Sequence, residues 1–553
     1  MPAPTAVNAT GLRGHSLLYS VSVFLSIGVW LFGVRLRVRG RDVLTTKALS
    51  RAPTSKRSPT AGEIGNMVAI LEIGAFITSL CAAYLADKYG RRMTMRIGAT
   101  LFSIGGVFQT YCAGYTSMVI GRFISGCGVG MLSMIVPIYQ AEISPADHRG
   151  FLGALEFTGN IVGYSSSVWI DYACSYIQSD WSWRLPLSIQ VLGGVILGLG
   201  SFVCPESPRY LIDTDQDAMG LQVISDFQGR DIDDPKVQVE YNEIREGVIA
   251  DRAVGDRSYK ALWTRYRSRV LIAMSSQLFA QLNGINVISY YAPLVFEQAG
   301  WIGRDAILMT GINSLFYVAS SIPPWWLTDA AGRRPILLFG ALAMAIALTA
   351  TGYWIYIDQA ITPNAVVVCV VVYNFAFGMS WGPIPWLYPP EIMPLPFRAK
   401  GVSLSTATNW LSNYWVGVTT PVFQELIGWR LYIMHAFFCV VSFILVYFLY
   451  PETRGVPLEE MDKLFGDEVV EVTETETEDE GFSESETSTL VGHRRPGSIL
   501  PISRTSTRSA SPSPARMGNS LFGRVQDMIS GGRKTRRSSL GHYRAIDDGD
   551  AEQ

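Results

Sequence analysis

The chain is poor in charged side chains and lacks the residue groupings of an enzyme. Only 17% of its 553 residues are Asp, Glu, Lys or Arg, whereas about 25% is usual in soluble proteins. We find no nucleophile–base set, no metal-ligand spacing and no nucleotide-binding loop, so we expect no enzymatic activity, no metal site and no cofactor. The formal net charge is −2, and no basic face suits nucleic acid. The seven cysteines are scattered through mostly apolar runs, which predicts buried free thiols rather than disulfides.

Long apolar runs are the main feature of the sequence. The mean hydropathy is +0.22, and a helix needs about 20 mostly apolar residues to cross the core of a bilayer. Twelve segments meet this requirement, six before the polar stretch 207–269 and six after it. Gly126, Gly128 and Gly130 lie inside one run, so they indicate close helix packing rather than a phosphate-binding loop. We predict an all-α membrane protein of two six-helix halves, with spanning helices at 17–34, 63–86, 95–115, 117–140, 151–176, 186–203, 270–298, 306–328, 335–357, 364–389, 401–424 and 430–450.

Three charged motifs occur twice, in the same order. Asp-x-x-Gly-Arg-Arg at 87–92 recurs at 329–334, 242 residues later. Glu142 and Glu391 each begin a Glu-Ile-x-Pro motif and each have an arginine seven residues further on, and Pro-Glu at 205–206 recurs at 451–452. Internal repetition of this kind indicates a duplicated architecture. In a hydrophobic chain, it favours a transporter built from two related halves around a central site.

The repeated motifs place carboxylates and guanidinium groups near the ends of the predicted helices. Arginine forms directional, often bidentate pairs with carboxylates. We expect these pairs to clasp the two halves, to hold the cytoplasmic side closed and to release when that side opens. The alternative for any single arginine is an anchor that follows the positive-inside rule. The predicted salt-bridge network comprises Asp87, Arg91, Arg92, Glu142, Arg149, Glu206, Asp329, Arg333, Arg334, Glu391, Arg398 and Glu452.

The distribution of Lys and Arg predicts the orientation. The loops that hold the repeated arginines are basic, whereas those near 113–117 and 359–363 contain neither Lys nor Arg. The basic side is therefore expected to be cytoplasmic, together with both termini. The tail is acidic at first and then rich in Ser, Thr, Pro and Arg, a composition typical of disorder. We divide the chain into a cytoplasmic N-terminus (1–16), an N-terminal half (17–203), a cytoplasmic linker (204–269), a C-terminal half (270–450), an end motif (451–464) and a disordered tail (465–553).

These motifs together resemble the sugar porter family of the major facilitator superfamily, and most closely its fungal-type hexose carriers. The likeness runs from about residue 63 to 464 and rests on the two Gly-Arg-Arg loops, Pro137-x-Tyr139-x-x-Glu142, Pro205-Glu206-Ser207-Pro208-Arg209 and Pro451-Glu452-Thr453-Arg454. It implies a multi-pass protein of the plasma membrane that carries a monosaccharide, either by facilitated diffusion or with protons. The alternatives are a sugar sensor that signals through its tail and a carrier inactivated by its unusual first helix. The tail is also a candidate for regulatory partners or for phosphorylation at 536–539.

A sugar site needs amides, which both donate and accept hydrogen bonds, and aromatic surfaces. Gln277 and Gln281 share one helix face, and Asn286 follows Gly284, where the helix is expected to unwind. The alternative is that buried amides only join helices. The family resemblance implies sugar contacts for Gln277, Gln281, Asn286, Asn313, Trp386 and Asn409, with Asn413 adjacent. The aromatic residues expected to line or gate the cavity are Tyr290, Tyr291, Phe377 and Trp410, for which simple packing is the alternative.

The sequence also departs from the family pattern. Ala280 replaces a usual glutamine, Phe157 replaces another with Glu156 and Asn160 nearby, and Gly378 replaces a common glutamate. The first two changes are expected to remove hydrogen bonds and to alter which sugar is held.

The first helix lacks the expected Asp, and the segment 35–57 is strongly basic. In proton-coupled members that Asp pairs with an arginine matched here by Arg122, our candidate for proton coupling. One hypothesis is a shifted reading frame or misjudged splice site across 34–58. The alternative is real divergence, with Arg122 paired elsewhere, for example with Glu72.

Overall fold

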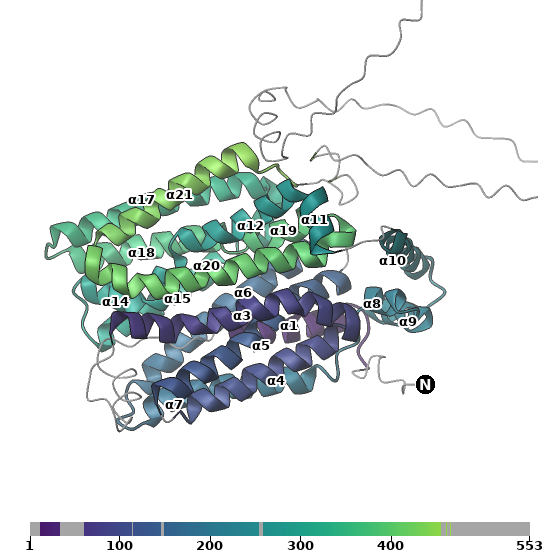
Figure 1. The fold of residues 1–553 in the computed structure, drawn as a ribbon, viewed down its shortest axis with the longest axis horizontal. Helices are drawn as coiled ribbons and strands as arrows, with labels where there is room; N and C mark the ends of the chain where they lie inside the picture. The colour runs from purple at the N-terminus through teal and green to yellow at the C-terminus, as the bar shows by residue number, and fades with distance from the viewer. Residues whose placement is uncertain are drawn as a thin grey trace, which may run out of the picture.

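The computed structural model describes residues 11–33, 60–112, 114–144, 149–253 and 258–454, together with residues 461 and 465. Within these residues the regular structure is α-helical apart from one short 3-10 helix. Figure 1 shows the helices as two layers, with the N-terminal half below and the C-terminal half above. The segment 34–58 and the tail from 466 lie outside the described residues, so our predictions for them stay predictions.

The N-terminal half consists of six long helices at the predicted places. The third of them, α4, follows α3 after a single residue, Gly90. A capping box starts α3: the hydroxyl of Thr60 accepts from the N–H of Glu63, whose carboxylate accepts from the N–H of Thr60. The helices are α1 (His15–Gly33), α3 (Ala61–Tyr89), α4 (Arg91–Thr110), α5 (Tyr115–Ile143), α6 (Arg149–Cys174) and α7 (Trp181–Gly200).

The C-terminal half also follows the predicted spans, but three of them are broken. The predicted unwinding at Gly284 is confirmed: its φ is +97°, a conformation that residues with a Cβ atom rarely adopt. The span around 306–328 bends by 44° before Pro324, a break that we did not predict. The helices are α12 (Arg267–Leu282), α13 (Ile285–Tyr290), α14 (Ala292–Gln298), α15 (Arg304–Ser320), α16 (Pro324–Ala331), α17 (Arg333–Ile357), α18 (Thr362–Met379), α19 (Ile384–Ile392), the 3-10 helix η2 (Leu395–Phe397), α20 (Arg398–Ile427) and α21 (Arg430–Leu449).

Length and composition alone identify fewer spans than the arrangement does. Among the described residues, six helices are long and apolar enough to cross a membrane, and a bent pair makes a seventh. Of the remaining bundle helices, α1 is apolar but contributes only the short stretch His15–Ser26, some are broken, like α12 to α14, and others are rich in small and polar side chains, like α20. Such residues are tolerated where neighbouring helices surround them. The predicted all-α fold of two six-helix halves is confirmed.

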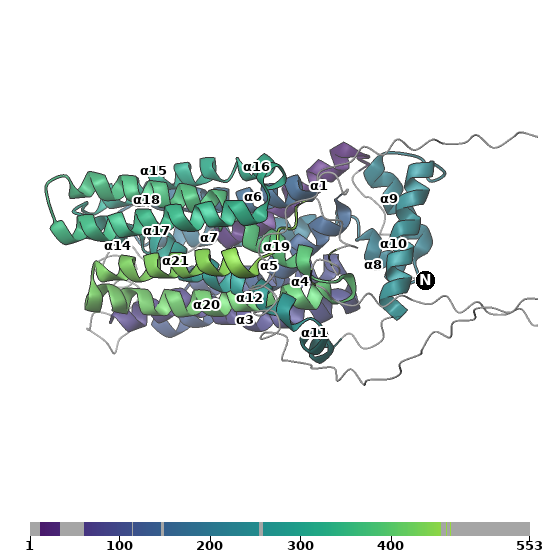
Figure 2. The ribbon, with the colours of Figure 1, turned by 90° about the horizontal axis from the view of Figure 1, so that it is seen from above.

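The polar linker is partly helical and lies at one end of the bundle (Figures 1 and 2). Its helices are α8 (Pro208–Asp213), α9 (Asp217–Gln228), α10 (Pro235–Ala253) and α11 (Tyr259–Arg265). Ile212, Ile224, Val237 and Val248 form a small apolar core that holds α8, α9 and α10 together. We call this end of the bundle the linker end.

Glycines allow the helices of the N-terminal half to pack closely. A Cβ atom on Gly126 of α5 would lie 2.0 Å from the carbonyl oxygen of Leu71 on α3. On Gly128 it would lie 2.5 Å from the carbonyl oxygen of Gly98 on α4. The expectation that this glycine run serves helix packing is therefore confirmed.

The two halves meet along two helix pairs. On one side, α3 packs against α20, and the Ser403 hydroxyl donates to the carbonyl of Ser79 at 3.0 Å. On the other side, α6 packs against α15, where the hydroxyls of Ser165 and Ser314 are 2.9 Å apart. These contacts bring the faces of α6, α13 and α20 around one central space.

Candidate functional site

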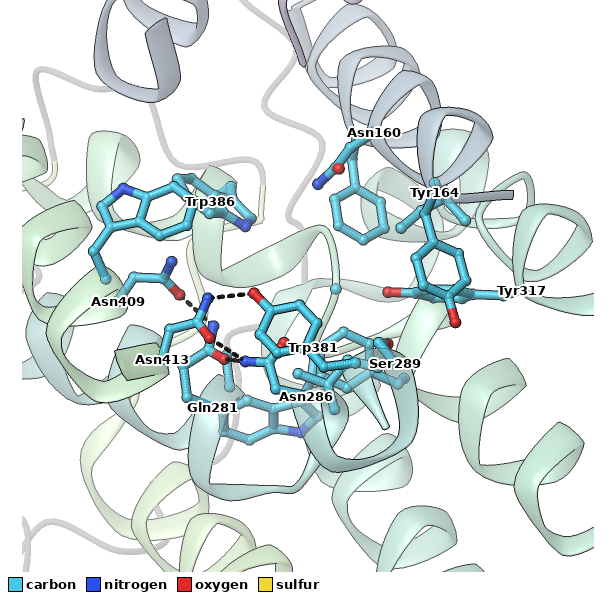
Figure 3. A pocket seen from close by; sticks show the side chains of 18 residues that line it. Asn160, Tyr164, Gln281, Asn286, Ser289, Tyr317, Trp381, Trp386, Asn409 and Asn413 are labelled. Carbon is cyan, nitrogen blue, oxygen red and sulfur yellow. Dashed lines mark hydrogen bonds between the residues drawn. The ribbon is translucent and has the colours of Figure 1, made fainter. Parts of the chain in front are cut away.

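A cavity of about 110 Å³ lies between the two halves. One wall comes from α6 of the N-terminal half, and the other walls come from α12, α13, α15 and α18 to α20 of the C-terminal half. Figure 3 shows Asn160 and Tyr164 of α6 facing the amide side chains of the other half across this space. The lining residues are Phe157, Asn160, Ile161, Tyr164, Ala280, Gln281, Ile285, Asn286, Ser289, Tyr290, Tyr317, Phe377, Trp381, Gly382, Trp386, Asn409, Trp410 and Asn413.

Four amides form a hydrogen-bonded group on one wall, which we call the amide cluster: Gln281, Asn286, Asn409 and Asn413. Asn286 Nδ2 donates both to Gln281 Oε1 and to Asn413 Oδ1, the latter at 2.8 Å. Gln281 Nε2 donates to Asn409 Oδ1 at 2.6 Å. All four residues are at least nine-tenths buried. These bonds pair the four amides with one another in a low-dielectric space, where an unpaired amide would be costly.

Aromatic rings form much of the remaining wall. Two of them are fixed by their indole nitrogens: Trp381 Nε1 donates to Leu337 O at 3.0 Å, and Trp410 Nε1 donates to Ser133 Oγ at 3.1 Å. Tyr164 and Tyr317 meet edge to face across the two halves, with ring centroids 5.9 Å apart. Flat apolar faces beside convergent amides suit a ligand with many hydroxyls and an apolar ring surface.

The sequence-predicted site residues divide into two groups. Gln281, Asn286, Trp386, Asn409 and Asn413 line the cavity, as do the predicted aromatic residues Tyr290, Phe377 and Trp410.

The other three predicted residues do not line the cavity. Gln277 donates to Pro385 O at 2.6 Å, and the Tyr291 hydroxyl donates to Gly417 O at 2.7 Å. Asn313 is fully buried within α15.

Two family departures shape the cavity directly. Phe157 and Ala280, which stand where glutamines are usual, both line it. The ring of Phe157 packs so closely on Gly382 that an added Cβ would lie 2.4 Å away. Gly378 instead packs against Ser320, whose hydroxyl would be 2.0 Å from an added Cβ. The first two changes leave the wall more apolar than glutamines would.

Sequence reasoning missed several lining residues, chiefly aromatic ones. Tyr164, Tyr317, Trp381 and Ser289 were not among the predicted site residues, yet all four line the cavity. Tyr164 lies four residues after Asn160 on α6, so helical spacing from Asn160 was a signal that could have found it. The others carried no signal that separates cavity lining from packing.

The repeated charges form one cluster in each half. In the N-terminal half, Arg91 binds both oxygens of Glu142, with Nε–Oε2 at 2.8 Å and Nη2–Oε1 at 2.6 Å. Glu206 accepts from the backbone N–H groups of Arg91 and Arg92, at 3.0 and 3.3 Å, and so caps the start of α4. Burial raises the pKa of Glu206, while backbone N–H groups and the Arg91 charge oppose that shift. Gly90 must be small, because an added Cβ would meet Glu206 at 2.7 Å.

The C-terminal half repeats this arrangement. Arg333 Nη2 donates to Glu391 Oε1 at 2.7 Å, and Arg333 Nη1 lies 3.2 Å from Asp329. Glu452 accepts from the backbone N–H groups of Arg333 and Arg334, at 2.9 and 3.0 Å, and caps α17. The similarity extends to a tyrosine in each half: the hydroxyl of Tyr139 donates to Pro205 O, and that of Tyr388 donates to Pro451 O.

The expectation that these pairs clasp the two halves needs correction. Arg91–Glu142 and Arg333–Glu391 each join two elements of the same half, because each copy of the duplicated motif contains a complete set of partners. Between the halves, the charge of Lys400 on α20 acts on Asp87 of α3. Arg398 begins α20 next to this region, and the side chain of Arg149 lies outside the described part of the chain.

At the linker end, Tyr259 of α11 contacts both halves. Its hydroxyl donates to Leu80 O on α3 at 3.2 Å and lies 3.1 Å from the hydroxyl of Ser403 on α20. Neutral hydrogen bonds of this kind, rather than the repeated ion pairs, connect α3 and α20 here.

The coupling candidate Arg122 is buried between α5 and α3. Its Nη2 donates to the carbonyl of Val68 at 2.5 Å, one helical turn before Glu72. Arg122 and Glu72 are 3% and 1% exposed. The charges of both act on Tyr291, and the pairing of Arg122 with Glu72 stays a prediction.

Two similar helical halves around a buried polar cavity define a transmembrane transporter of the major facilitator class. Residues 21–465 match the family model described as "Sugar (and other) transporter". The chain therefore belongs to the sugar porter family, which confirms the resemblance predicted from the motifs. The match begins at residue 21, within α1, whereas we had expected the likeness to start at about residue 63.

Individual relatives agree with this assignment. The chain is 33% identical to the MFS glucose transporter mfs1 of Aspergillus flavus, with 81% of this chain and 89% of that protein covered. It is 30% identical to the high glucose sensor RGT2 of Saccharomyces cerevisiae, with 82% and 61% covered. Among solved structures, the proton:xylose symporter XylE of E. coli bound to 6-bromo-6-deoxy-D-glucose superposes with a TM-score of 0.72, at 26% identity over 81% of this chain and 99% of that one.

Proposed function

We propose that this protein carries a monosaccharide of the hexose type across a membrane by alternating access. The observation that supports this most is the cavity between the halves, where the amide cluster faces Asn160 and aromatic rings. Sugar hydroxyls can both donate to and accept from these amides, while the rings cover the apolar face of the sugar.

The amides of the site are hydrogen-bonded to one another. A sugar hydroxyl that binds Gln281 or Nδ2 of Asn286 would replace one of these bonds with a bond of its own. Such an exchange has a small net energy, which suits a carrier that must both bind and release its cargo. Rocking of the halves along α3–α20 and α6–α15 would then expose the cavity to each side in turn.

The location and coupling follow from the same reasoning. We propose that the linker end faces the cytoplasm, with both chain termini on that side, and that the membrane is the plasma membrane. Transport is either facilitative or coupled to protons; the relatives include a proton:xylose symporter, which supports the second mode. Regulatory proteins or kinases are the proposed partners of the tail.

A sugar sensor is the second candidate, because one relative is the high glucose sensor RGT2. The two functions separate on deletion of residues 470–553. A carrier retains sugar uptake without the tail, whereas a sensor loses its downstream signal.

Labelled hexose uptake in a host without its own sugar carriers tests the proposal directly. Saturable uptake that is lost in Gln281→Ala, with surface expression checked for both, is the expected result. Absence of uptake by the wild-type protein at the cell surface would refute the carrier function. Sugar binding to that same protein would then favour the sensor.

A further inference from the structure

A continuous chain of hydrogen bonds runs from a buried carboxylate in one half to the amide cluster in the other. Tyr290 of α13 donates its hydroxyl proton to Glu72 Oε1 at 3.0 Å. The oxygen of the same hydroxyl accepts from Asn413 Nδ2 at 3.0 Å. Asn413 Oδ1 in turn accepts from Asn286 Nδ2 at 2.8 Å, within the cavity wall. Glu72 lies on α3 of the N-terminal half, so the chain crosses the interface that must open and close.

We propose that Glu72 binds the proton that accompanies the sugar, and that Tyr290 transmits its protonation state to the amide cluster. The inference rests on the proposed sugar site and names the group that links this site to protons. Its basis is the direction of the hydrogen bonds in this series. Each bond has one donor and one acceptor, so reversing the bond at one end requires the following bonds to reverse or break.

The expected sequence of events begins with an ionised Glu72, which only accepts hydrogen bonds. When a proton from water adds to one carboxylate oxygen, the carboxyl gains an O–H donor directed at the Tyr290 oxygen. The Tyr290 proton must then turn toward Asn413, whose amide has to present its oxygen. That flip places the Asn413 NH₂ group against the NH₂ group of Asn286 and breaks the bond between them. Asn286 is left with a free donor at the cavity, where a sugar hydroxyl can accept it.

The coupling has the sign that symport requires. Protonation of Glu72 creates a donor for the sugar, and by reciprocity the bound sugar favours protonation of Glu72. Release of the proton on the other side restores the original polarity and weakens sugar binding. No oxidant or further reactant takes part, because a single proton is bound and released.

The surroundings of Glu72 suit a group that changes charge. The titratable and charged groups near it are Tyr290 of α13, which is bonded to it, and Tyr291, on which the charges of both Glu72 and Arg122 of α5 act. The neighbouring helix α20 contributes the amide of Asn413. The buried guanidinium of Arg122 favours the ionised form of Glu72, whereas burial favours the protonated form. These opposing influences allow both states of the carboxyl to exist at one site.

The test is the pH dependence of sugar binding to the purified full-length protein, measured with D-glucose by tryptophan fluorescence. For the wild type, affinity is expected to tighten as the pH falls from about 8 to about 5, by at most about tenfold per pH unit for one linked proton. Glu72→Gln, which is permanently neutral, is expected to bind with an affinity that no longer depends on pH.

Two further variants keep the test decisive. Tyr290→Phe retains Glu72 and Arg122 but lacks the hydroxyl, so its affinity is also expected to lose the pH dependence; it decides the matter where Glu72→Gln does not fold. Glu156→Gln, at a second buried carboxyl on α6, is the matched control and is expected to keep the wild-type profile.

The outcomes separate this inference from the proposed function. Wild-type pH dependence in both Glu72→Gln and Tyr290→Phe would overturn the role of Glu72, and its loss in Glu156→Gln alone would assign that role to Glu156. A wild-type protein that binds glucose equally at all pH values would also overturn it. A wild-type protein that binds no sugar at any pH would instead refute the proposed sugar site.

Discussion

Breaking the ion pair between Arg91 and Glu142 should destabilise the protein more than breaking its counterpart in the other half. Arg91 contacts both oxygens of Glu142 at 2.8 and 2.6 Å, and the side chains are 10% and 12% exposed. In the second pair, Arg333 contacts one oxygen of Glu391, which is 23% exposed, and also has Asp329 at 3.2 Å.

The magnitudes follow from these differences in geometry and burial. Removal of one partner from a buried pair costs about 3–5 kcal/mol. Because the side chain of Glu142 is 12% exposed, we expect Glu142→Gln to lower the free energy of unfolding by about 3 kcal/mol, near the low end of that range. For Glu391→Gln we expect about 1–2 kcal/mol, since Arg333 keeps a second carboxylate.

Double-mutant cycles of denaturant unfolding in detergent micelles provide the measurement. The coupling energy is expected to be about 2–3 kcal/mol for Arg91→Gln with Glu142→Gln, and about 1 kcal/mol for the second pair. The exposed pair Arg230–Asp234 of the linker serves as a control and should give about 0.2–0.5 kcal/mol. A coupling below about 0.5 kcal/mol for the first pair, or the reverse order of the two, would refute this reasoning.

Three other predictions concern packing, closure and binding. Gly126→Ala places a methyl group 2.0 Å from a backbone oxygen of α3, so it should lower the free energy of unfolding by more than the roughly 1–3 kcal/mol of ordinary overpacking. Gly247→Ala, where the added methyl group has open space, should raise the free energy of unfolding by up to about 1 kcal/mol. Equal effects of the two substitutions in unfolding experiments would contradict the packing argument. Tyr259→Phe removes a hydroxyl that contacts both halves, so α3 and α20 should separate more often. The rate of thiol labelling of a Ser79→Cys reporter on α3 should then rise about two- to tenfold, and an unchanged rate would argue against closure by this contact. Gln281→Ala removes two bonds from the amide cluster and should weaken hexose binding by about 1–3 kcal/mol in a binding titration; wild-type affinity would remove Gln281 from the site.

Most of the fold could be predicted because a bilayer imposes a length on every apolar run. The second helix was expected at 63–86 and spans Ala61–Tyr89. The break at Gly284 was also predictable, since glycine readily adopts a positive φ. The bend at Pro323 and Pro324 was missed although two prolines were present, because spanning helices tolerate proline where neighbouring groups satisfy the freed backbone, so proline alone does not mark a break.

The candidate site was less predictable, for different reasons on its two sides. Buried amides are rare enough in spanning helices to attract attention, and Gln281, Asn286 and Asn409 indeed line the cavity. Aromatic residues are common in such helices, so Tyr317 and Trp381 could not be distinguished from ordinary packing. Gln277 shares a face with Gln281, but its amide donates to the carbonyl of Pro385 on α19. That carbonyl has no helical partner, because residue 389, four positions later, is a proline without an N–H group.

The partners of the repeated arginines were the least predictable feature. The repeat showed that arginines and glutamates recur together but did not reveal which copies contact each other. Duplication offers the physical explanation, because a half that was once complete by itself already contained its own pairs. Arg91 thus binds Glu142, and Arg333 binds Glu391, without any exchange between the halves.

The two capping glutamates have a consequence for the integrity of the polypeptide. Glu206 follows the last helix of the N-terminal half and caps the start of its third helix, α4. Glu452 follows the last helix of the C-terminal half and caps the start of its third helix, α17. Each half thus has its own glutamate, placed directly after its last helix, that caps its third helix. Cleavage of the backbone between Gln228 and Pro235 would leave both capping contacts intact. Two pieces produced by such a cut would each contain both the capping glutamate and the helix start that it caps.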